Sequence, residues 1–289
     1  MMASPGPLII RHMTVTTSAT SSLDSSARRA RGFAVLVLAA TIGFCAIATA
    51  GAEDPQIATR RASERKVFSD PDIIKGFFKT AFGAEFRISG AIDRIRKYDK
   101  PVRIYIDGRG TPDRRSEVAE VVADIGAKIQ HLDIAITTNR DEANMTVTLV
   151  RERDLRRTIR KTYGSDRARQ IQKNLDPQCL SGFQKDETFR IIRSDVILVV
   201  DAGNFIFRDC AFEEMLQALG PINDTDIPWT MFNDDVQMGF FGIYDQYILN
   251  ILYHPRIKAG MTVDEVSGLL PQILPKVRAF VARTNNLAP

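Results

Sequence analysis

After residue 70, the chain alternates between stretches where apolar residues recur every three or four positions and shorter stretches where they alternate with polar residues or run together. The first pattern predicts amphipathic helices and the second predicts strands. A short uninterrupted apolar run is typical of a strand buried in a sheet. The predicted helices cover 73–82, 115–132, 244–253, 262–274 and 276–283, and the predicted strands cover 102–106, 134–137, 145–150 and 196–200.

Two other segments also have helical character. Residues 151–173 are basic and carry few large apolar side chains, which predicts a solvent-exposed, mobile helical region. The segment after residue 204 has an apolar stripe at helical spacing, formed by Phe212, Met215, Leu216 and Leu219. The order strand, helix, strand, strand, strand, helix predicts an α+β fold: a mixed sheet with a backing helix, a helix that carries polar residues, and a helical C-terminal part.

Composition divides the chain into four parts. Residues 1–52 form a leader, 53–69 a polar linker, 70–284 a single domain and 285–289 a short tail. The chain after the leader, about 237 residues, is long enough to bury a substantial core.

The leader has the features of a secretory signal. Three arginines at 28, 29 and 31 precede an apolar run at 33–50, and Ala50-Gly51-Ala52 fits cleavage before Glu53. This order predicts an exported protein of the periplasm or cell envelope. Because the run is long for a cleaved signal, an uncleaved single-pass anchor through 33–50 is the alternative, and it is the one predicted membrane contact.

Net charge changes when the leader is set aside. The whole chain has 39 basic and 35 acidic residues, and the leader accounts for four arginines and one aspartate, so the remainder is close to neutral. A basic pI would otherwise suggest nucleic acid as a partner. The near-neutral remainder instead predicts that the protein does not bind nucleic acid.

Two cysteines lie outside the leader, Cys179 and Cys210. An even pair in an exported protein most often forms a disulfide, and two buried thiols are the alternative. The bond would close a loop of about 30 residues and contribute on the order of 3–4 kcal/mol.

The helix after residue 204 carries polar residues at a distinctive spacing: Glu213-Glu214-x-x-Gln217-x-x-Gly220-x-x-Asn223-Asp224. This resembles the helix frame of zinc peptidases, H-E-x-x-H-x-x-G-x-x-H/D. The resemblance to zincins implies that Glu213 and Gln217 occupy the metal-ligand positions. It also implies that Glu214 is the general base and that Gly220 turns the chain toward Asn223 and Asp224.

The ligand positions depart from the zinc frame because both histidines are replaced. The chain has three histidines in all, His12 in the leader, His131 and His254, and none lies near the frame. Zinc requires strong nitrogen or sulfur ligands, so no zinc site is predicted. The oxygen set Glu213, Gln217 and Asp224 would instead suit a hard divalent cation, which is the alternative.

Without a metal, a polar network is predicted in its place. A lone buried carboxylate is costly, so Glu213 should be paired or hydrogen-bonded, with Gln217 one turn along the helix as the nearest donor. Asn223, Asp224 and the indole of Trp229 are further candidates. Met231 stands where metzincins place their methionine turn, although a buried methionine that fills a gap would look the same.

The C-terminal part also resembles a known family. The frame above is followed by Phe232-Asn233-Asp234, Tyr244-Asp245 and Leu252-Tyr253-x-Pro255-Arg256-x-x-x-Gly260-Met261-Thr262. These motifs are similar to an uncharacterised bacterial family of secreted or lipoprotein-type proteins that is catalogued as a domain of unknown function. The resemblance spans Asp70 to Pro275 and implies an exported protein.

Three functions remain open at this point. The sequence favours a non-catalytic exported protein whose zincin-like domain binds a peptide or an envelope protein, for example by adding a strand to a sheet edge. A metal-dependent hydrolase with an all-oxygen site and Glu214 as general base is the alternative. A structural protein anchored by residues 33–50 is the third.

Overall fold

The computed structural model describes residues 9–12, 53–82, 93–108, 110–174 and 178–287. The predicted signal sequence, its apolar run at 33–50 and the cleavage site at Ala52 lie outside the described residues. No helix in the described part is long and apolar enough to cross a membrane.

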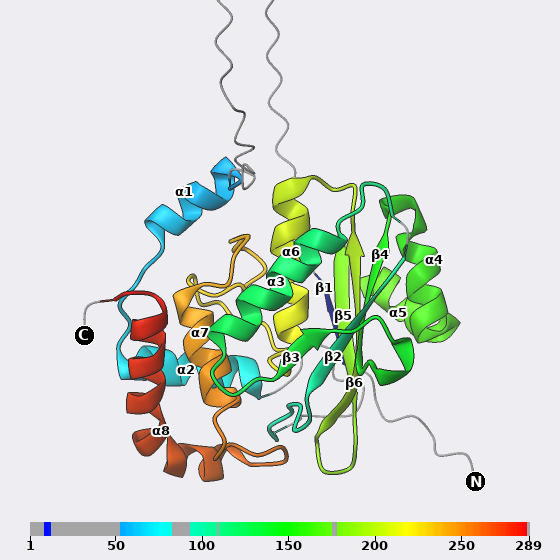
Figure 1. Ribbon diagram of the computed structural model, residues 1–289. Helices are drawn as coiled ribbons and strands as arrows, with labels where there is room; N and C mark the ends of the chain where they lie inside the picture. Colours follow the sequence, from blue (N-terminus) through cyan, green and yellow to red (C-terminus); the bar gives the residue numbers. More distant parts are fainter. Residues whose placement is uncertain (1–8, 13–52, 83–92, 109, 175–177, 288–289) are drawn as a thin grey trace, which may run out of the picture. The chain divides into compact units, whose positions relative to one another are not determined.

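A mixed sheet of six strands has the order β1-β5-β6-β4-β2-β3 (Figure 1). The pairs β2–β3, β2–β4 and β4–β6 are parallel, while β5 runs antiparallel to β6 and β1 antiparallel to β5. The strands are β1 (Ile9–His12), β2 (Val102–Asp107), β3 (Ile134–Ile136), β4 (Met145–Val150), β5 (Cys179–Lys185) and β6 (Ile191–Val199).

Four of these strands match the sequence prediction, but β5 and β1 were missed. The β5 residues Cys-Leu-Ser-Gly-Phe-Gln-Lys neither alternate nor form an apolar run. Their strand conformation comes from pairing with β6 along seven registered positions. The leader was excluded from the predicted fold, yet Ile9–His12 pairs with Leu180–Phe183 on the outer side of β5.

Helices cover both faces of the sheet. On one face lie α3 (Arg115–Lys128), which contacts β3, and α6 (Asn204–Gln217), which contacts β5 and β6. On the other face, α4 (Glu152–Tyr163) contacts β4 and β6, and α5 (Ser165–Asn174) packs on α4 (Figure 1).

The basic region at 151–173 is therefore helical, as predicted, but it is attached to the sheet. Leu155 and Ile159 of α4 and Ala168 and Ile171 of α5 are buried against Leu180, Ile197 and Val199. A few apolar residues at helical spacing are enough to anchor both helices, while the arginines remain on the outer side.

A second group of helices comprises α2 (Asp70–Ala81), α7 (Ile243–Leu252) and α8 (Val263–Thr284), which contact one another. A capping box formed by Thr262 and Glu265 begins α8. The sequence predicts two helices here, but α8 is one helix that contains Pro271 and Pro275.

The segments assigned to a linker and a tail also differ from that description. Helix α1 (Pro55–Ser63) forms within residues 53–69, and its Ile57 is fully buried. Asn285 donates from Nδ2 to Gln246 Oε1 on α7 at 2.6 Å, so the start of the 285–289 segment is tied to the helices.

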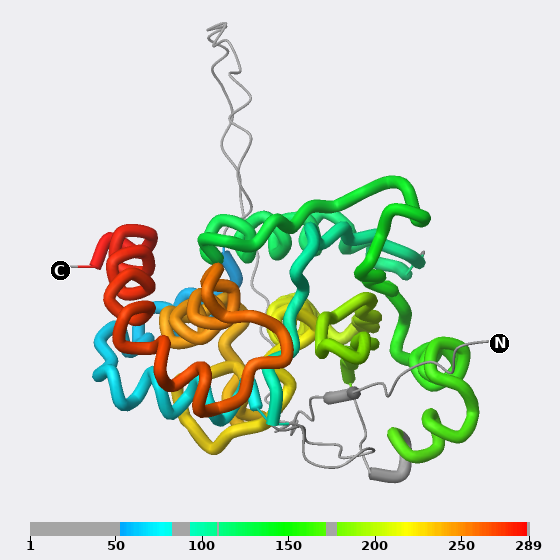
Figure 2. Tube along the Cα trace, turned by 90° about the horizontal axis from the view of Figure 1, so that it is seen from below, coloured from blue at the N-terminus to red at the C-terminus, as the bar shows by residue number. Residues whose placement is uncertain are grey.

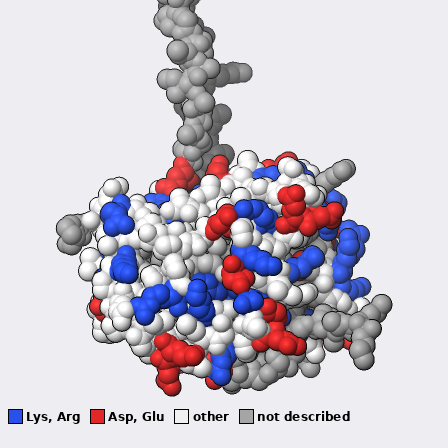
Figure 3. Space-filling model, turned by 60° about the horizontal axis from the view of Figure 1, so that its bottom comes forward, with Lys and Arg blue, Asp and Glu red and all other residues white. Residues whose placement is uncertain are grey.

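Together these elements form an α+β fold, as predicted: a mixed sheet, a backing helix, a central helix α6 and a helical C-terminal part. Basic and acidic side chains are interspersed on the face shown in Figure 3, and neither sign forms one continuous region there.

Candidate functional site

From Asp209 to Gln217, helix α6 is buried on every side, which is unusual for a helix segment with several polar residues. The predicted apolar stripe is confirmed: Phe212, Met215, Leu216 and Leu219 are all at most 1% exposed. Glu213, Glu214 and Gln217 are also at most 2% exposed. Polar groups at that depth need hydrogen-bond partners, because an unsatisfied buried group costs about 1–3 kcal/mol.

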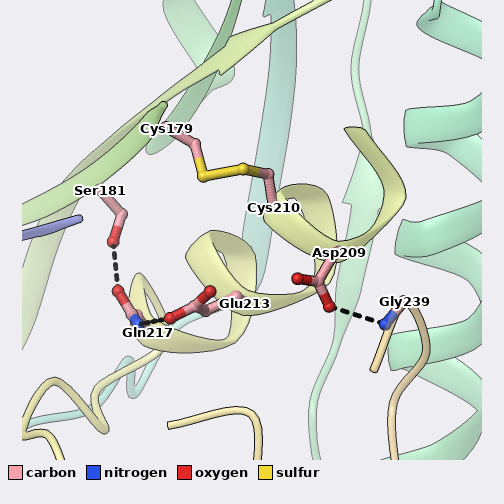
Figure 4. Close-up of a disulfide and its surroundings, with 7 residues drawn as sticks. All are labelled: Cys179, Ser181, Asp209, Cys210, Glu213, Gln217 and Gly239. Atoms are coloured by element: carbon pink, nitrogen blue, oxygen red, sulfur yellow. Dashed lines mark hydrogen bonds between the residues drawn. A yellow bond between two sulfur atoms is a disulfide. The ribbon is translucent and has the colours of Figure 1, made fainter. Parts of the chain in front are cut away.

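Glu213 and Gln217 are joined to the sheet by a chain of hydrogen bonds. Gln217 Nε2 donates to Glu213 Oε1 at 3.0 Å, and Ser181 Oγ on β5 donates to Gln217 Oε1 at 3.2 Å (Figure 4). We call Ser181, Glu213 and Gln217 the α6–β5 network. The pairing of Glu213 with Gln217 follows the predicted spacing of i and i+4. Ser181 was not predicted, because it lies on the strand that the sequence pattern did not reveal.

This arrangement does not fit a zinc ion. The two hydrogen bonds orient the Gln217 amide so that its nitrogen faces Glu213 and its oxygen faces Ser181. Glu213 and Gln217 therefore do not present two oxygens to one position, as ligands of a metal would. Within the described part of the chain, no three His, Cys, Asp or Glu side chains form a group that could hold a metal.

Glu214, the candidate general base, is fully buried beside this network. Its charge reaches Tyr163 on α4, whose pKa lies well above the usual value because of burial and then the charges of Asp195 and Glu214. The Tyr163 hydroxyl donates to the Asp195 carbonyl at 3.3 Å. Glu214 thus interacts with groups inside the fold.

The C-terminus of α6 is held by side chains that satisfy its last carbonyls. Ser194 Oγ donates to the Ala218 carbonyl at 2.9 Å, and the Tyr253 hydroxyl donates to the Leu219 carbonyl at 2.8 Å. Gly220 follows with φ of 138°, and a Cβ there would lie 2.3 Å from the carbonyl oxygen of Arg96. Only glycine satisfies both conditions, so the predicted turn at Gly220 has a structural reason.

Beyond the turn, the side chain of Asn223 is bonded to the end of α2. Asn223 Nδ2 donates to the Lys79 carbonyl on α2 at 2.7 Å and to the Asp224 carbonyl at 3.3 Å. Asp224 is half-buried beside it. Trp229 is 37% exposed and packs against the guanidinium of Arg65.

Met231 is buried, and a carboxylate that the sequence did not identify as a site residue holds its backbone. Asp245 on α7 accepts from the Met231 N–H at 3.2 Å and from the Thr230 hydroxyl. Burial, and then the charge of Glu64, raise the pKa of Asp245 to about 7, against the effect of these two bonds. Asp245 is fully buried in a helix that also buries Gln246 and Asn250, so the sequence pattern did not single out its role.

Asp209 on α6 bonds to a later part of the loop that contains Met231. It accepts from the N–H groups of Met238 and Gly239, both at 2.7 Å, and burial raises its pKa to about 6 (Figure 4). We call Asp209 and Asp245 the loop carboxylates, because each fixes backbone N–H groups of the loop at 227–242.

Cys179 and Cys210 form the predicted disulfide, with their Cα atoms 6.0 Å apart (Figure 4). It ties the first residue of β5 to α6, on the same pair of elements as the α6–β5 network. Such bonds are typical of proteins in oxidising compartments.

Arg96 is a buried cation that the sequence pattern did not reveal. It is fully buried, donates from Nη2 to the Ala81 carbonyl at the end of α2 at 3.0 Å, and lies 5.9 Å from the Phe183 ring centroid on β5. Burial lowers its pKa to about 10.

The two histidines outside the leader lie together but away from α6. The rings of His131 and His254 are 5.9 Å apart between centroids. His254 Nδ1 accepts from the Arg256 N–H at 3.2 Å, a local contact within the turn that follows α7.

The fold and this site define an α+β protein in which a central helix carries a buried polar network. A family model described as protein of unknown function (DUF2927) matches residues 70–272. The match covers more than half of the chain, which therefore belongs to this family. Comparison with curated proteins and comparison with solved structures each find no match.

Proposed function

We propose that this is an exported, non-catalytic protein with a zincin-like scaffold, and that it binds a peptide or an envelope protein as an added strand on the outer edge of β5. The observation that carries the proposal is the pairing of β1 with β5. Residues 9–12 lie outside the family match at 70–272 and add to that edge in an antiparallel register. An edge strand that accepts one added segment is suited to accept another.

The likeness to zincins is supported by the arrangement around α6. A backing helix follows the first central strand, the antiparallel strand β5 forms the edge of the domain's own sheet, and the polar helix follows β6. In a zincin this helix carries the metal ligands. Here the α6–β5 network occupies the corresponding residues, which supports a binding role over hydrolysis. No observation favours Glu214 as a general base, since a base must reach its substrate and Glu214 is fully buried.

The backbone groups of β5 that face outward can be assigned from the neighbouring strands. The Ser194 N–H of β6 donates to the Asn144 carbonyl on the β4 side, and Ser194 is opposite Phe183. Because strand residues alternate in direction, the groups of Ser181 and Phe183 face away from β6, while those of Leu180 and Gly182 face it.

This assignment gives a direct test by amide hydrogen exchange. In the chain that starts at Glu53, the amides of Ser181 and Phe183 should exchange quickly, and those of Leu180 and Gly182 slowly. A synthetic peptide of residues 7–14 added in trans should slow the first pair and leave the second unchanged. The same peptide with Arg11→Pro is the matched control, because Arg11 lies opposite Ser181 and its N–H faces β5, so proline removes a donor of the ladder.

Two results would contradict the proposal. One is equal exchange at Ser181 and Phe183 in the whole chain and in the chain from Glu53. The other is equal protection by the peptide and its proline variant.

Export is a separate part of the proposal, supported by the disulfide and by the leader pattern. N-terminal sequencing of protein from the cell envelope should find Glu53 first. A start before residue 33 would replace cleavage with an anchor.

A further inference from the structure

An open cavity of about 310 Å³ lies apart from the α6–β5 network. Three segments form it: residues 97–101 before β2, 131–133 between α3 and β3, and 253–259 after α7. The segment after α7 lies against the segment that leads into β2 (Figure 2), where Gly260 N–H donates to the Ile95 carbonyl at 2.8 Å. No residue of the network lines the cavity.

The charged groups of this cavity are not balanced. Asp99 and Asp133 are each engaged by an arginine outside the lining, with Arg190 2.8 Å from Asp99 and Arg103 2.8 Å from Asp133. The three lining lysines, Lys97, Lys100 and Lys258, have no carboxylate within ion-pair distance among the described residues. The cavity wall therefore has an excess of positive charge.

Lys97 is the central cation of the three. It is only 7% exposed, and its ammonium donates to the carbonyls of Leu252 at 2.7 Å and Ile257 at 3.2 Å. An ammonium has three donors, so two bonds leave one for another acceptor. Burial, and then the charge of Lys258, lower the pKa of Lys97 to about 7, against the opposing effect of the Asp99 charge.

The rest of the lining is largely apolar. Pro101, Leu132, Tyr253, Pro255 and Ile257 provide carbon surface around the lysines. The volume is at the lower end of the range for small-molecule sites. Apolar walls beside one buried ammonium suit a compact apolar body with a single negative head.

We propose that this cavity binds a small organic carboxylate, with Lys97 bound to the carboxylate and Lys100 and Lys258 at the entrance. A buried cation next to a carboxylate forms a charge-assisted hydrogen bond, which is stronger than a neutral one. The exposed lysines attract the anion, and the apolar wall covers its body. This role is independent of strand addition at β5.

The test uses benzoate as the anionic probe and benzamide as its neutral analogue of the same shape. With the whole chain, benzoate should shift the backbone amide signals of 97–100, 131–133 and 256–259, with a Kd in the millimolar range typical of small ligands. Benzamide should not. Inorganic phosphate, which has no apolar body, should bind more weakly than benzoate.

Variants assign the binding to the lysines. Lys97→Met should abolish it. Because that change also removes two hydrogen bonds at the end of α7, the double variant Lys100→Gln/Lys258→Gln, at two exposed positions, is the safer test. It should weaken benzoate about 3- to 10-fold. Lys79→Gln, on α2, controls for the loss of a lysine elsewhere.

Three outcomes would overturn the proposal. These are no signal shifts up to about 50 mM benzoate, equal shifts with benzamide, and a double variant that binds benzoate as tightly as Lys79→Gln does.

Discussion

The α6–β5 network and the loop carboxylates are both buried on or beside α6, but they hold the fold by different means. In the first, side chains bond to side chains: Ser181 to Gln217 and Gln217 to Glu213. In the second, Asp209 and Asp245 bond mainly to backbone N–H groups of a loop without regular structure. The first region joins two regular elements, and the second gives a shape to a segment that has none of its own.

The difference has an electrostatic consequence. Burial raises the pKa of both loop carboxylates, so their charge is costly at neutral pH. The α6–β5 network has in addition a covalent bond, Cys179–Cys210, between the same two elements. The two regions should therefore respond differently to reduction and to pH.

The largest expected effect comes from removing the disulfide. Cys179→Ala/Cys210→Ala should lower the free energy of unfolding by about 3–4 kcal/mol, because a loop of about 30 residues is no longer closed in the unfolded state. Denaturant titration measures the loss. Hydrogen exchange should increase in β5 and remain unchanged in the loop at 227–242. Equal loosening of both would show that the two regions are one cooperative unit.

Gly220→Ala should cost about 2–4 kcal/mol, since the added Cβ meets the Arg96 carbonyl and the residue must keep a positive φ. The matched control is Gly268→Ala in α8, where a Cβ meets nothing within 4 Å. That change should stabilise by about 0.5–1 kcal/mol. If the two variants have the same stability, the close contact at Gly220 is not a constraint.

Asp245→Asn tests the loop carboxylates through pH. The folded pKa of Asp245 is raised to about 7. Its contribution to stability is therefore fully present below about pH 4 and is lost as pH rises through 7. The wild-type protein should lose up to about 4 kcal/mol over that window through this group, and the variant should have a shallower slope.

Denaturant titrations at several pH values between 4 and 8 measure the slope. The stability of the Asp245→Asn variant should still fall as pH rises, because Asp209 remains and its pKa is also raised. Asp235→Asn, an exposed change in the same loop, controls for the loss of one charge. Equal slopes for wild type and Asp245→Asn would mean that Asp245 does not titrate as described.

The two regions also differ in how far the sequence predicts them. Glu213 and Gln217 are visible as a pair because i and i+4 share a helix face. Ser181 is not visible, because it lies 36 residues from Gln217 on a strand without a strand pattern. The loop carboxylates are hidden for another reason: an Asp in a helix does not reveal which backbone N–H groups of a distant loop it will bind. Regular elements such as α3 follow from local periodicity, whereas β5 and the loop depend on tertiary contacts.

The smallest expected effects test whether the α6–β5 network acts as a unit. Glu213→Ala should lower the free energy of unfolding by about 1–3 kcal/mol, because Gln217 Nε2 loses its acceptor in a buried site. Ser181→Ala should cost about 0.5–1.5 kcal/mol, because Gln217 Oε1 loses a donor. If Gln217 couples the two residues, the double variant Ser181→Ala/Glu213→Ala should lower the free energy of unfolding by less than the sum of the two single changes. The difference, which is the coupling energy, should be about 0.5–1 kcal/mol. Denaturant titration of the four proteins in this cycle gives the coupling. A value of zero would mean that Glu213 and Ser181 are held independently and that β5 is positioned on α6 by the disulfide and apolar packing. In that case, strand addition at β5 would not depend on the polar residues of α6.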